Sequence, residues 1–356
     1  MAGETPKKNN RLVLAERPER GPVTPTTFRH EEVDIKPLAD GEVMVKVEYS
    51  AIEATMRNWL NAARSYIEPV EIGATMRALG IGHVIASRDG KFKPGDLVYG
   101  TLGWQTYFVG PGKELRHRKT PKGGRDIDHL GLFGISGMTA YFGMFDIGRL
   151  KDGETVVISG AAGSVGLIAT QIALAHPKCK VVTIAGGPEK CAKLKELGAH
   201  VSLDYKSPNF AKEFRKVGLV DVYFDNVGGE ILDLLLTRMK PYGRIIACGA
   251  ISAYSAKEPY GLKNYSTVIS MKLRYQGFIA MDYTSRYPEA QAYLADLVGR
   301  GKMNYEYTLL KPKQGEKNGL GRCVEGMDVV SKGGNVGKTV IQIAETVEDD
   351  KFKAKL

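Results

Sequence analysis

The sequence predicts an α/β protein in which a doubly wound parallel sheet accompanies a mostly β domain. A buried strand that leads through a glycine-bearing turn into a helix occupies residues 155–175, and strands alternate with helices from residue 134 to about residue 307. This alternation predicts a parallel sheet with helices on both faces. The first 130 residues are rich in short alternating strands and turns. Because 356 residues are too many for one ordinary core, we expect two domains.

Composition narrows the class of protein. The hydrophobic content of 43% and the charged content of 25% are typical of a soluble globular protein. No apolar run approaches the roughly twenty residues that cross a bilayer, and the N-terminal stretch shows no apolar signal region, so we expect a cytoplasmic protein without a membrane partner. The net charge is +10, but the basic residues are scattered, which disfavours nucleic acid as a partner and suits an anionic cofactor. Four widely spaced cysteines predict reduced thiols: Cys179, Cys191, Cys248 and Cys323.

The turn after residue 159 is typical of a site that binds a dinucleotide. It follows the pattern AxGxxG, with Ala161, Gly163 and Gly166 at the three marked positions. A glycine at 163 lets the backbone approach a pyrophosphate, and a glycine at 166 lets the helix pack closely on the strand. The helix N-terminus at Ser164 and Val165 presents free N–H groups to the phosphates. An ordinary strand-to-helix turn is the alternative interpretation.

The segments after this turn favour the dinucleotide interpretation. A helix with apolar residues at helical spacing ends at His176-Pro177, and the strand 181–184 follows. Strand, turn, helix and parallel strand within about thirty residues form the βαβ unit of a Rossmann domain.

The end of the second strand predicts which cofactor binds. An NAD site carries a carboxylate there for the ribose 2′-hydroxyl. This sequence has Gly186-Gly187 and then Pro188, Glu189 and Lys190, so a cation is available for a 2′-phosphate. We therefore expect NADP(H) rather than NAD(H). The alternative is that Lys190 is a solvated helix residue paired with Glu189.

Further elements complete the predicted sheet. The expected strands are 201–203, 220–224, 244–248 and 273–280, and the expected helices are 231–239 and 288–298, the last burying Ala290, Tyr293, Leu294, Leu297 and Val298. Strand ends at Asp225-Asn226 and Cys248-Gly249 fall at the carboxyl edge, where α/β proteins bind ligands. A simple turn is the alternative for residues 226–229.

The remaining segments form the β domain. The strand 42–49 places Val43, Val45, Val47 and Tyr49 on one face, and a turn at 93–96 precedes the strand 97–99. The last strand, 337–343, has no crossover helix after it, so we expect it to rejoin the β domain. The predicted division is residues 1–133 for the first part of the β domain, 134–307 for the Rossmann domain and 308–356 for the return.

An ordered set of motifs resembles one family along nearly the whole chain. The motifs are Asn10-Arg11, 53–57 (EATMR), 134–143 with GMTAY at 137–141, the turn 161–166, 204–206 (DYK), 225–230 (DNVGGE), 248–252 (CGAIS), 276–278 (QGF) and 335–338 (NVGK). They resemble the zinc-free branch of the medium-chain dehydrogenase/reductase superfamily, which contains leukotriene dehydrogenase/prostaglandin reductases, plant double-bond reductases and bacterial curcumin reductases.

The resemblance implies a GroES-like β-barrel catalytic domain interrupted by the Rossmann domain, an active site in the cleft between them, and a homodimer. It implies that Lys190 binds the 2′-phosphate and that Tyr205 lies on the phosphate side. With the turn and strand ends, the implied cofactor-binding residues are Thr139, Gly163, Ser164, Val165, Gly166, Gly186, Lys190, Tyr205, Asn226, Cys248, Gly249, Ala250, Ile251, Ser252, Tyr254, Phe278, Ile279, Ala280 and Asn335.

The zinc ligands of related alcohol dehydrogenases are not predicted here. Such a site needs a cysteine, a histidine and a third ligand. Residues 51–57 contain neither cysteine nor histidine, and His83, at an expected strand start, stands alone. We therefore expect no metal and a conjugate reduction. Hydride goes to the β-carbon of an enone or enal, a hydrogen-bond donor stabilises the enolate oxygen, and a proton is added at the α-carbon.

Several tyrosines are candidates for that donor. Many relatives have tyrosines where this chain has Thr55 and Ser270. Tyr265 is the first choice because it lies between two segments at the cofactor edge, and Tyr66 and Tyr283 are further candidates. Tyr107, Tyr254 and, as an apolar wall, Trp104 are also considered, although a packed tyrosine is the common alternative. A quinone reductase and a non-catalytic NADPH-binding protein remain competing interpretations, and a zinc alcohol dehydrogenase is disfavoured.

Overall fold

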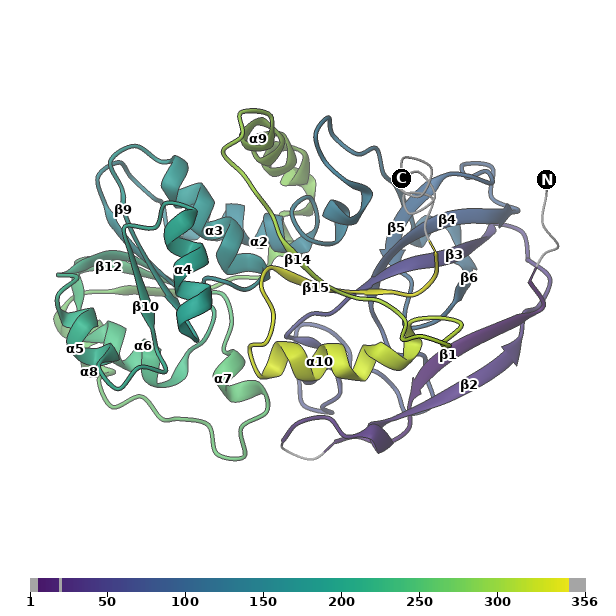
Figure 1. Cartoon of the computed structure of the whole chain (residues 1–356), viewed down its shortest axis with the longest axis horizontal. Coiled ribbons are helices and arrows are strands. Elements are labelled where there is room, and N and C mark those ends of the chain that lie inside the picture. The colour runs from purple at the N-terminus through teal and green to yellow at the C-terminus, as the bar shows by residue number, and fades with distance from the viewer. Residues whose placement is uncertain (1–5, 19–20, 346–356) are drawn as a thin grey trace.

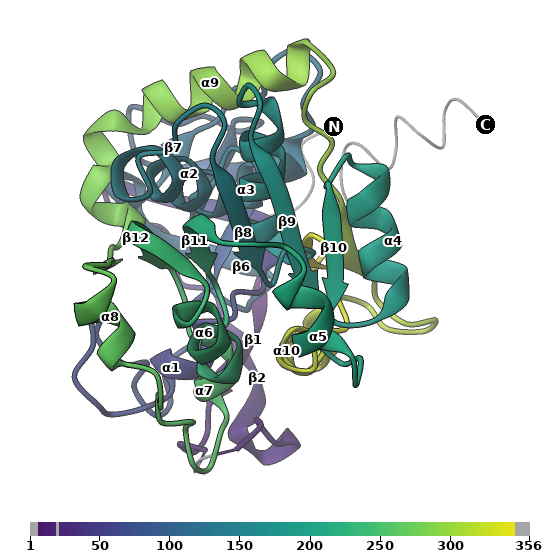
Figure 2. The same ribbon diagram turned by 90° about the vertical axis from the view of Figure 1, so that its left-hand side faces the viewer.

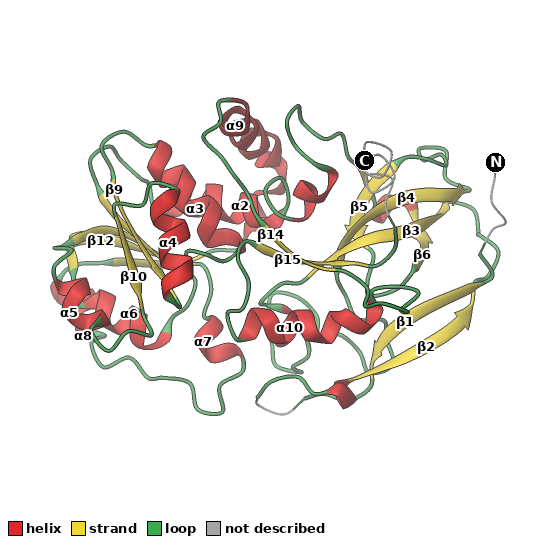
Figure 3. Cartoon of the chain, viewed as in Figure 1, coloured by secondary structure: helices red, strands yellow, loops and turns green. Residues whose placement is uncertain are grey.

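The computed structural model of the chain describes residues 6–18 and 21–345. It contains a six-stranded sheet, a seven-stranded sheet and a two-stranded sheet. The two large sheets lie in separate regions, and helix α10 (Cys323–Ser331) runs between them beside the two-stranded sheet (Figures 1 and 3). The predicted pairing of a parallel-sheet domain with a β domain is therefore confirmed.

The six-stranded sheet has the order β10-β9-β8-β11-β12-β13, and every neighbouring pair is parallel. Its strands are β8 (Thr155–Ser159), β9 (Lys180–Ala185), β10 (Val201–Asp204), β11 (Val220–Asp225), β12 (Met239–Ala247) and β13 (Arg274–Gly277). The strand order reverses beside β8, and a doubly wound sheet binds its dinucleotide at this reversal. The turn singled out in the sequence lies at this point.

Side chains of β8 alternate between two cores. Val156 and Ile158 join the core formed with α2 (Ile135–Phe142), α3 (Ser164–Ala175), α4 (Pro188–Glu196) and α9 (Tyr287–Gly299). Val157 joins the core formed with α5 (Phe210–Arg215) and α6 (Gly229–Leu236). Because neighbouring side chains of a strand point to opposite faces, helices cover both sides of the sheet, as Figure 2 shows.

Predicted segments differ from the structure in some of their ends and in some of their buried side chains. Helix α6 ends at Leu236 rather than at 239, because Met239 already pairs with Val220 as the first residue of β12. The predicted strand 273–280 ends at Gly277, and a short 3-10 helix begins at Ala280. In α9, Ala290, Leu294 and Leu297 are buried, whereas Tyr293 and Val298 are half-buried. Helix α10 was not predicted.

The seven-stranded sheet contains β14 (Tyr307–Leu310), β15 (Lys338–Gln342), β3 (Glu42–Ala51), β4 (Leu79–Ser87), β5 (Leu97–Thr101) and β7 (Arg116–His117) in that order, with β6 (Tyr107–Pro111) paired to β3. The two-stranded sheet pairs β1 (Lys8–Leu14) with β2 (Phe28–Asp34). Strand β15 runs antiparallel to β3, so the chain returns to the first domain as predicted. The domain limits at residues 133 and 307 stay predictions, and residues 346–356 of the last segment lie outside the described residues.

A β-bulge corrects one prediction for β3. Between Val47 and Tyr49 the register against β4 shifts, so Glu48 is an extra residue and the alternation changes by one. Val43, Val45 and Val47 share the core with Trp104, but Tyr49 lies in a separate cluster with Ile81 and Leu130. The prediction that all four β3 side chains share one face is therefore wrong for Tyr49.

His83 lies in the middle of β4, not at a strand start. Its Nδ1 lies 2.7 Å from Oε1 of the buried Glu48, and this hydrogen bond raises the pKa of His83 above its usual 6.5, against the opposing effect of burial. The ion pair therefore contributes its full stability below pH 6.5 and loses it as the pH rises through the raised pKa. We expect the urea midpoint to decline as the pH rises above about 6.5 and through the raised pKa, and His83→Gln to flatten this decline. An unchanged slope in His83→Gln would refute this assignment.

Candidate functional site

The turn after β8 combines close packing with an open helix end. Gly160 has a φ of +57°, and its carbonyl oxygen accepts the N–H of Gly163 at 2.9 Å. A Cβ added at Gly166 would lie 2.3 Å from the Gly160 oxygen, whereas one at Gly163 would come no closer than 3.2 Å. Gly166 is thus required for packing, and Gly163 leaves room in front of the turn. The first N–H groups of α3 have no partner within the helix, as at any helix N-terminus.

Two residues that sequence reasoning missed support this turn. The hydroxyl of Ser164 donates to Ser136 at 2.7 Å, and the phenol oxygen of the buried Tyr305 lies 2.7 Å from the same Ser164 oxygen. Tyr305 OH also lies 3.1 Å from the Ser164 carbonyl oxygen. These contacts come from α2 and from the chain after α9. No local sequence pattern could have indicated them.

The predicted phosphate residues Gly186, Lys190 and Tyr205 lie together beyond β9. A Cβ on Gly186 would lie 2.8 Å from the Tyr205 ring, so only glycine lets the ring cover this strand end. Lys190 donates to the Gly333 carbonyl oxygen at 2.6 Å rather than pairing with Glu189. Burial and then the nearby Lys206 ammonium lower the pKa of Lys190. Two close cations favour an anionic ligand, and Lys206 is an addition to the predicted set.

One carboxylate does lie near this strand end, but it belongs to β10. Oδ1 of Asp204 accepts the backbone N–H groups of Gly187, at 2.8 Å, and Lys206, at 2.9 Å. These bonds shape the turn that presents Tyr205 and Lys206. The tip of β9 itself carries glycine, as the NADP(H) prediction requires.

Replacing Lys190 by alanine tests the assignment of the phosphate site. A hydrogen bond to a charged group is worth about 1.5–3 kcal/mol, so we expect the Kd for NADPH to rise about 10- to 100-fold while the Kd for NADH hardly changes. Lys193→Ala is the matched control, because Lys193 on the same helix pairs with Glu306. Fluorescence titration measures both constants. Equal NADPH affinity of the Lys190 variant and the control would contradict the assignment.

A buried polar network organises the end of β11. Asp225 is 1% exposed, and its Oδ1 accepts the Tyr223 hydroxyl at 2.7 Å and the Gly228 N–H at 2.8 Å. Burial raises the pKa of this carboxyl. The neighbouring Asn226 donates through Nδ2 to the Ser159 carbonyl oxygen at 2.8 Å. Asn226 therefore lies where β8 and β11 both end.

The predicted segment 248–254 lies against Asn226 and Val227. The N–H groups of Cys248 and Gly249 both donate to the Asp225 carbonyl oxygen at 3.0 Å, and Ser252 N donates to Val227 O at 3.1 Å. Helix α7 (Ile251–Tyr254) follows. The Tyr254 hydroxyl accepts the Ala250 N–H at 3.1 Å, which fixes its ring over the segment.

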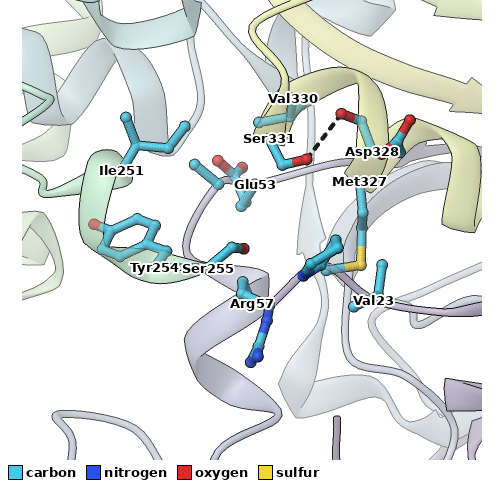
Figure 4. A pocket seen from close by; sticks show the side chains of 12 residues that line it. Val23, Glu53, Arg57, Ile251, Tyr254, Ser255, Met327, Asp328, Val330 and Ser331 are labelled. Carbon is cyan, nitrogen blue, oxygen red and sulfur yellow. Dashed lines mark hydrogen bonds between the residues drawn. The ribbon is translucent and has the colours of Figure 1, made fainter. Parts of the chain in front are cut away.

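Helix α7 forms one wall of a cleft between the two domains. Ile251 and Tyr254 lie on one side, side chains of α10 lie on the other, and Glu53 projects between them (Figure 4). Arg57 of α1 (Met56–Trp59) also lines this cleft. Asn335 lies near the dinucleotide turn. Its side-chain amide donates to the Gly337 carbonyl oxygen, and the Gly337 N–H donates to the Ala162 carbonyl oxygen of the turn at 2.8 Å. The chain's return segment thus reaches the dinucleotide turn.

Other predicted residues lie apart from this cleft. The Thr139 hydroxyl donates to Ile135 O at 2.7 Å inside α2, and Phe278 and Ala280 pack against the core of α2 and α9, with Ile279 between them. Tyr283 stacks on Phe142 with ring centroids 4.5 Å apart. The contact of Thr139 and of residues 278–280 with the cofactor stays a prediction, as does the role of Tyr283 as a donor.

The tyrosine candidates are now separated in space. Tyr265 precedes α8 (Ser266–Ser270) and is 58% exposed outside the cleft lining. Tyr107 lies in β6 of the β domain. The Tyr66 hydroxyl lies 3.2 Å from Oγ1 of Thr55, and Tyr66 is 51% exposed and also lies outside the cleft lining. Trp104 is fully buried against Phe28, so the prediction that it forms a substrate wall is wrong.

Three further features of residues 6–18 and 21–345 concern metals, thiols and the membrane. Within these residues no group of three or more histidine, cysteine, aspartate or glutamate side chains could hold a metal ion. All four cysteines are free thiols, as predicted. None of the helices in the described part of the chain is both long and apolar enough to span a bilayer.

Comparison with known proteins assigns the family. A family model described as the N-terminal domain of oxidoreductase matches residues 10–117, and one described as zinc-binding dehydrogenase matches residues 164–296. The NADPH-dependent curcumin reductase of Escherichia coli is 36% identical over 96% of this chain and 99% of its own. The NADP(+)-dependent 2-alkenal reductase of Nicotiana tabacum is 32% identical over 86% of this chain and 89% of its own.

A solved structure gives the same result. CurA of Vibrio vulnificus in complex with NADPH has a TM-score of 0.86 and 34% identity, and the match covers 95% of this chain and 100% of that one. The cofactor prediction is confirmed at the level of NADP(H). The chain therefore belongs to the zinc-free branch of the medium-chain dehydrogenase/reductase superfamily and is an NADPH-dependent oxidoreductase.

Proposed function

We propose that the protein is an ene-reductase that adds hydride to the β-carbon of an α,β-unsaturated ketone or aldehyde. The observation that carries the proposal is the hydroxyl pair of Thr55 and Tyr66, which lies beside Tyr254 where the two domains face each other. Burial raises the pKa of Tyr254, and repulsion from Tyr66 adds to this effect. Tyr254 therefore keeps its phenol proton at neutral pH. The names of the curcumin and 2-alkenal reductases support this substrate class.

The residues of the turn fit NADPH. Gly163 presents no side chain at the α3 N-terminus, and Lys190 has a carbonyl rather than a carboxylate as its partner. We propose that the α3 N-terminus holds the pyrophosphate, that Lys190 and Tyr205 hold the 2′-phosphate, and that Asn226, segment 248–254 and Asn335 surround the ribose and nicotinamide. When bound, NADPH supplies the hydride.

The chain's own residues orient the acceptor and stabilise its charge. A donor placed where negative charge develops lowers the barrier, because it interacts more strongly with an enolate than with a ketone. We propose that Tyr66, oriented by Thr55, donates to the carbonyl oxygen. Ile251 and Tyr254 form the wall against the alkene. Apolar walls exclude water and strengthen the hydrogen bond to the enolate.

A substrate panel tests the function. NADPH oxidation is followed with enals, enones, quinones and simple aldehydes, and the products are identified by mass and NMR. We expect turnover of enals and enones with saturated carbonyl products. Turnover of quinones alone would indicate a quinone reductase, and NADPH binding with no turnover would indicate a non-catalytic protein. Either result would refute the proposal. The predicted homodimer also stays a prediction, which light scattering tests.

The donor assignment predicts a contrast between two tyrosine variants. Losing one donor to a developing oxyanion costs about 10²–10³ in kcat, so Tyr66→Phe should lower kcat with the best enone by about this factor. Tyr265→Phe is the matched control, and we expect nearly wild-type kcat because Tyr265 takes no part in the hydrogen bond between Thr55 and Tyr66. Steady-state kinetics and NADPH affinity are measured for both. A large loss in Tyr265→Phe with full activity in Tyr66→Phe would reverse the assignment.

A further inference from the structure

A buried ion pair links the cofactor turn to the substrate cleft. Lys338, in β15, is 1% exposed and pairs with Glu53. Glu53 follows the end of β3 and lines the cleft. Removing two charges from water costs about as much free energy as their attraction returns, so a buried pair is weak evidence for stability. Its presence at the cleft therefore calls for another role.

On the cofactor side, Lys338 follows the segment that touches the dinucleotide turn. Gly337 N donates to Ala162 O at 2.8 Å, and Gly337 also bridges to Gly163. A Cβ on Gly337 would lie 1.8 Å from the Glu306 carbonyl oxygen, so the backbone has no freedom to shift there. The position of Lys338 is thus set by the turn that we propose holds the pyrophosphate.

On the substrate side, Glu53 begins the short segment that carries the proposed donor. Its carbonyl oxygen accepts the Met56 N–H at 3.1 Å, which starts the turn into α1. Thr55 lies within this turn and bonds to Tyr66. Any displacement of Glu53 therefore moves Thr55 and, through it, the Tyr66 hydroxyl.

We infer that Lys338 and Glu53 are positioning residues that hold segment 53–66, with its proposed donor Tyr66, in register with the cofactor turn. The inference rests on the proposed function, since it assigns this donor to an enone or enal substrate. It has two consequences. Loss of the pair raises the KM for the substrate more than the Kd for NADPH, and NADPH binding orders segment 53–66 through the pair.

Four variants separate positioning from simple stability. Lys338→Met and Glu53→Gln each break the pair. The double variant Glu53→Leu/Lys338→Met replaces it with apolar side chains, which commonly preserves stability. Lys338→Arg keeps the charge and is the conservative variant. Thermal unfolding selects the folded proteins, and Glu53→Gln, which preserves side-chain shape, remains informative if the methionine variants do not fold.

We expect Lys338→Arg to keep most of the wild-type affinity, with a KM for the best enone close to that of the wild type. We expect the folded double variant and Glu53→Gln to raise this KM about tenfold or more, while their Kd for NADPH stays within about twofold of wild type. Hydrogen exchange of segment 53–66 should slow on NADPH addition in the wild type and not in these variants. A folded variant without the pair but with wild-type KM and exchange would overturn the inference. If the wild type reduces no enone while NADPH still slows this exchange through Lys338, the proposed function fails and the positioning role stands.

Discussion

Replacing Asp225 by leucine is expected to destabilise the protein severely. Its Oδ1 accepts the N–H groups of Val227, at 3.0 Å, and Gly228, at 2.8 Å, in addition to the Tyr223 hydroxyl. Each buried donor without an acceptor costs about 1–3 kcal/mol, so the two N–H groups alone cost about 2–6 kcal/mol. Urea unfolding should show a much lower midpoint with the same slope. NADPH binding should also weaken, because Asn226 loses its fixed position.

Asp225→Asn is the matched control, since an amide oxygen still accepts both N–H groups. We expect this variant to keep most of the stability of the wild type. A second control, Tyr223→Phe, removes one donor and leaves the carboxylate with its backbone partners. A leucine variant within about 1 kcal/mol of wild type would show that the network does not organise this strand end.

Gly166→Ala is expected to disrupt the packing of α3 on β8. The new Cβ would lie 2.3 Å from the Gly160 carbonyl oxygen and 2.7 Å from the Ala161 Cα, both backbone atoms that cannot rotate away. The helix must therefore shift from the strand. Overpacking of this kind costs about 1–3 kcal/mol, and the shift misplaces the N–H groups that face the pyrophosphate. We expect a lower unfolding midpoint and an NADPH Kd at least about tenfold higher.

Gly163→Ala provides a contrast within the same turn. Its Cβ would lie 3.2 Å from the Gly160 carbonyl oxygen, a contact that a shift of a few tenths of an ångström relieves, so the protein without cofactor should lose much less stability than Gly166→Ala. Because the proposed pyrophosphate approaches this backbone, NADPH affinity should still fall. If the two alanine variants lose stability equally, Gly163 is a packing residue and its assignment to the phosphates is wrong.

The parts of the fold that could be predicted are those with local signals. The turn with Gly163 and Gly166, the proline that ends α3, and the alternation of buried strands and helices each act over a few residues. The end of α6 could not be found in this way, because Met239 continues the apolar pattern and only its pairing with Val220 makes it a strand residue. The bulge at Glu48 depends on the partner strand in the same way.

In the candidate site, too, residues with a local sequence signal could be predicted, whereas contacts between distant segments could not. Lys190 and Tyr205 were found from strand ends, but the partner of Lys190, Gly333, is 143 residues away in the sequence. The contact between Thr55 and Tyr66 joins a helix start to a loop without any periodic pattern. Sequence reasoning therefore favoured Tyr265, whereas the contact with Thr55 and the neighbouring Tyr254 favour Tyr66.

Transfer of deuterium from NADPH labelled at C4 tests the central claim most directly. The enzyme is given the best α,β-unsaturated ketone from the panel, with each face of the cofactor labelled in turn, and NMR locates the deuterium in the product. We predict that one labelled form delivers deuterium to the β-carbon of a saturated ketone, while the α-carbon takes its proton from solvent. Deuterium on the carbinol carbon of an unsaturated alcohol would contradict the assignment of the protein as an ene-reductase.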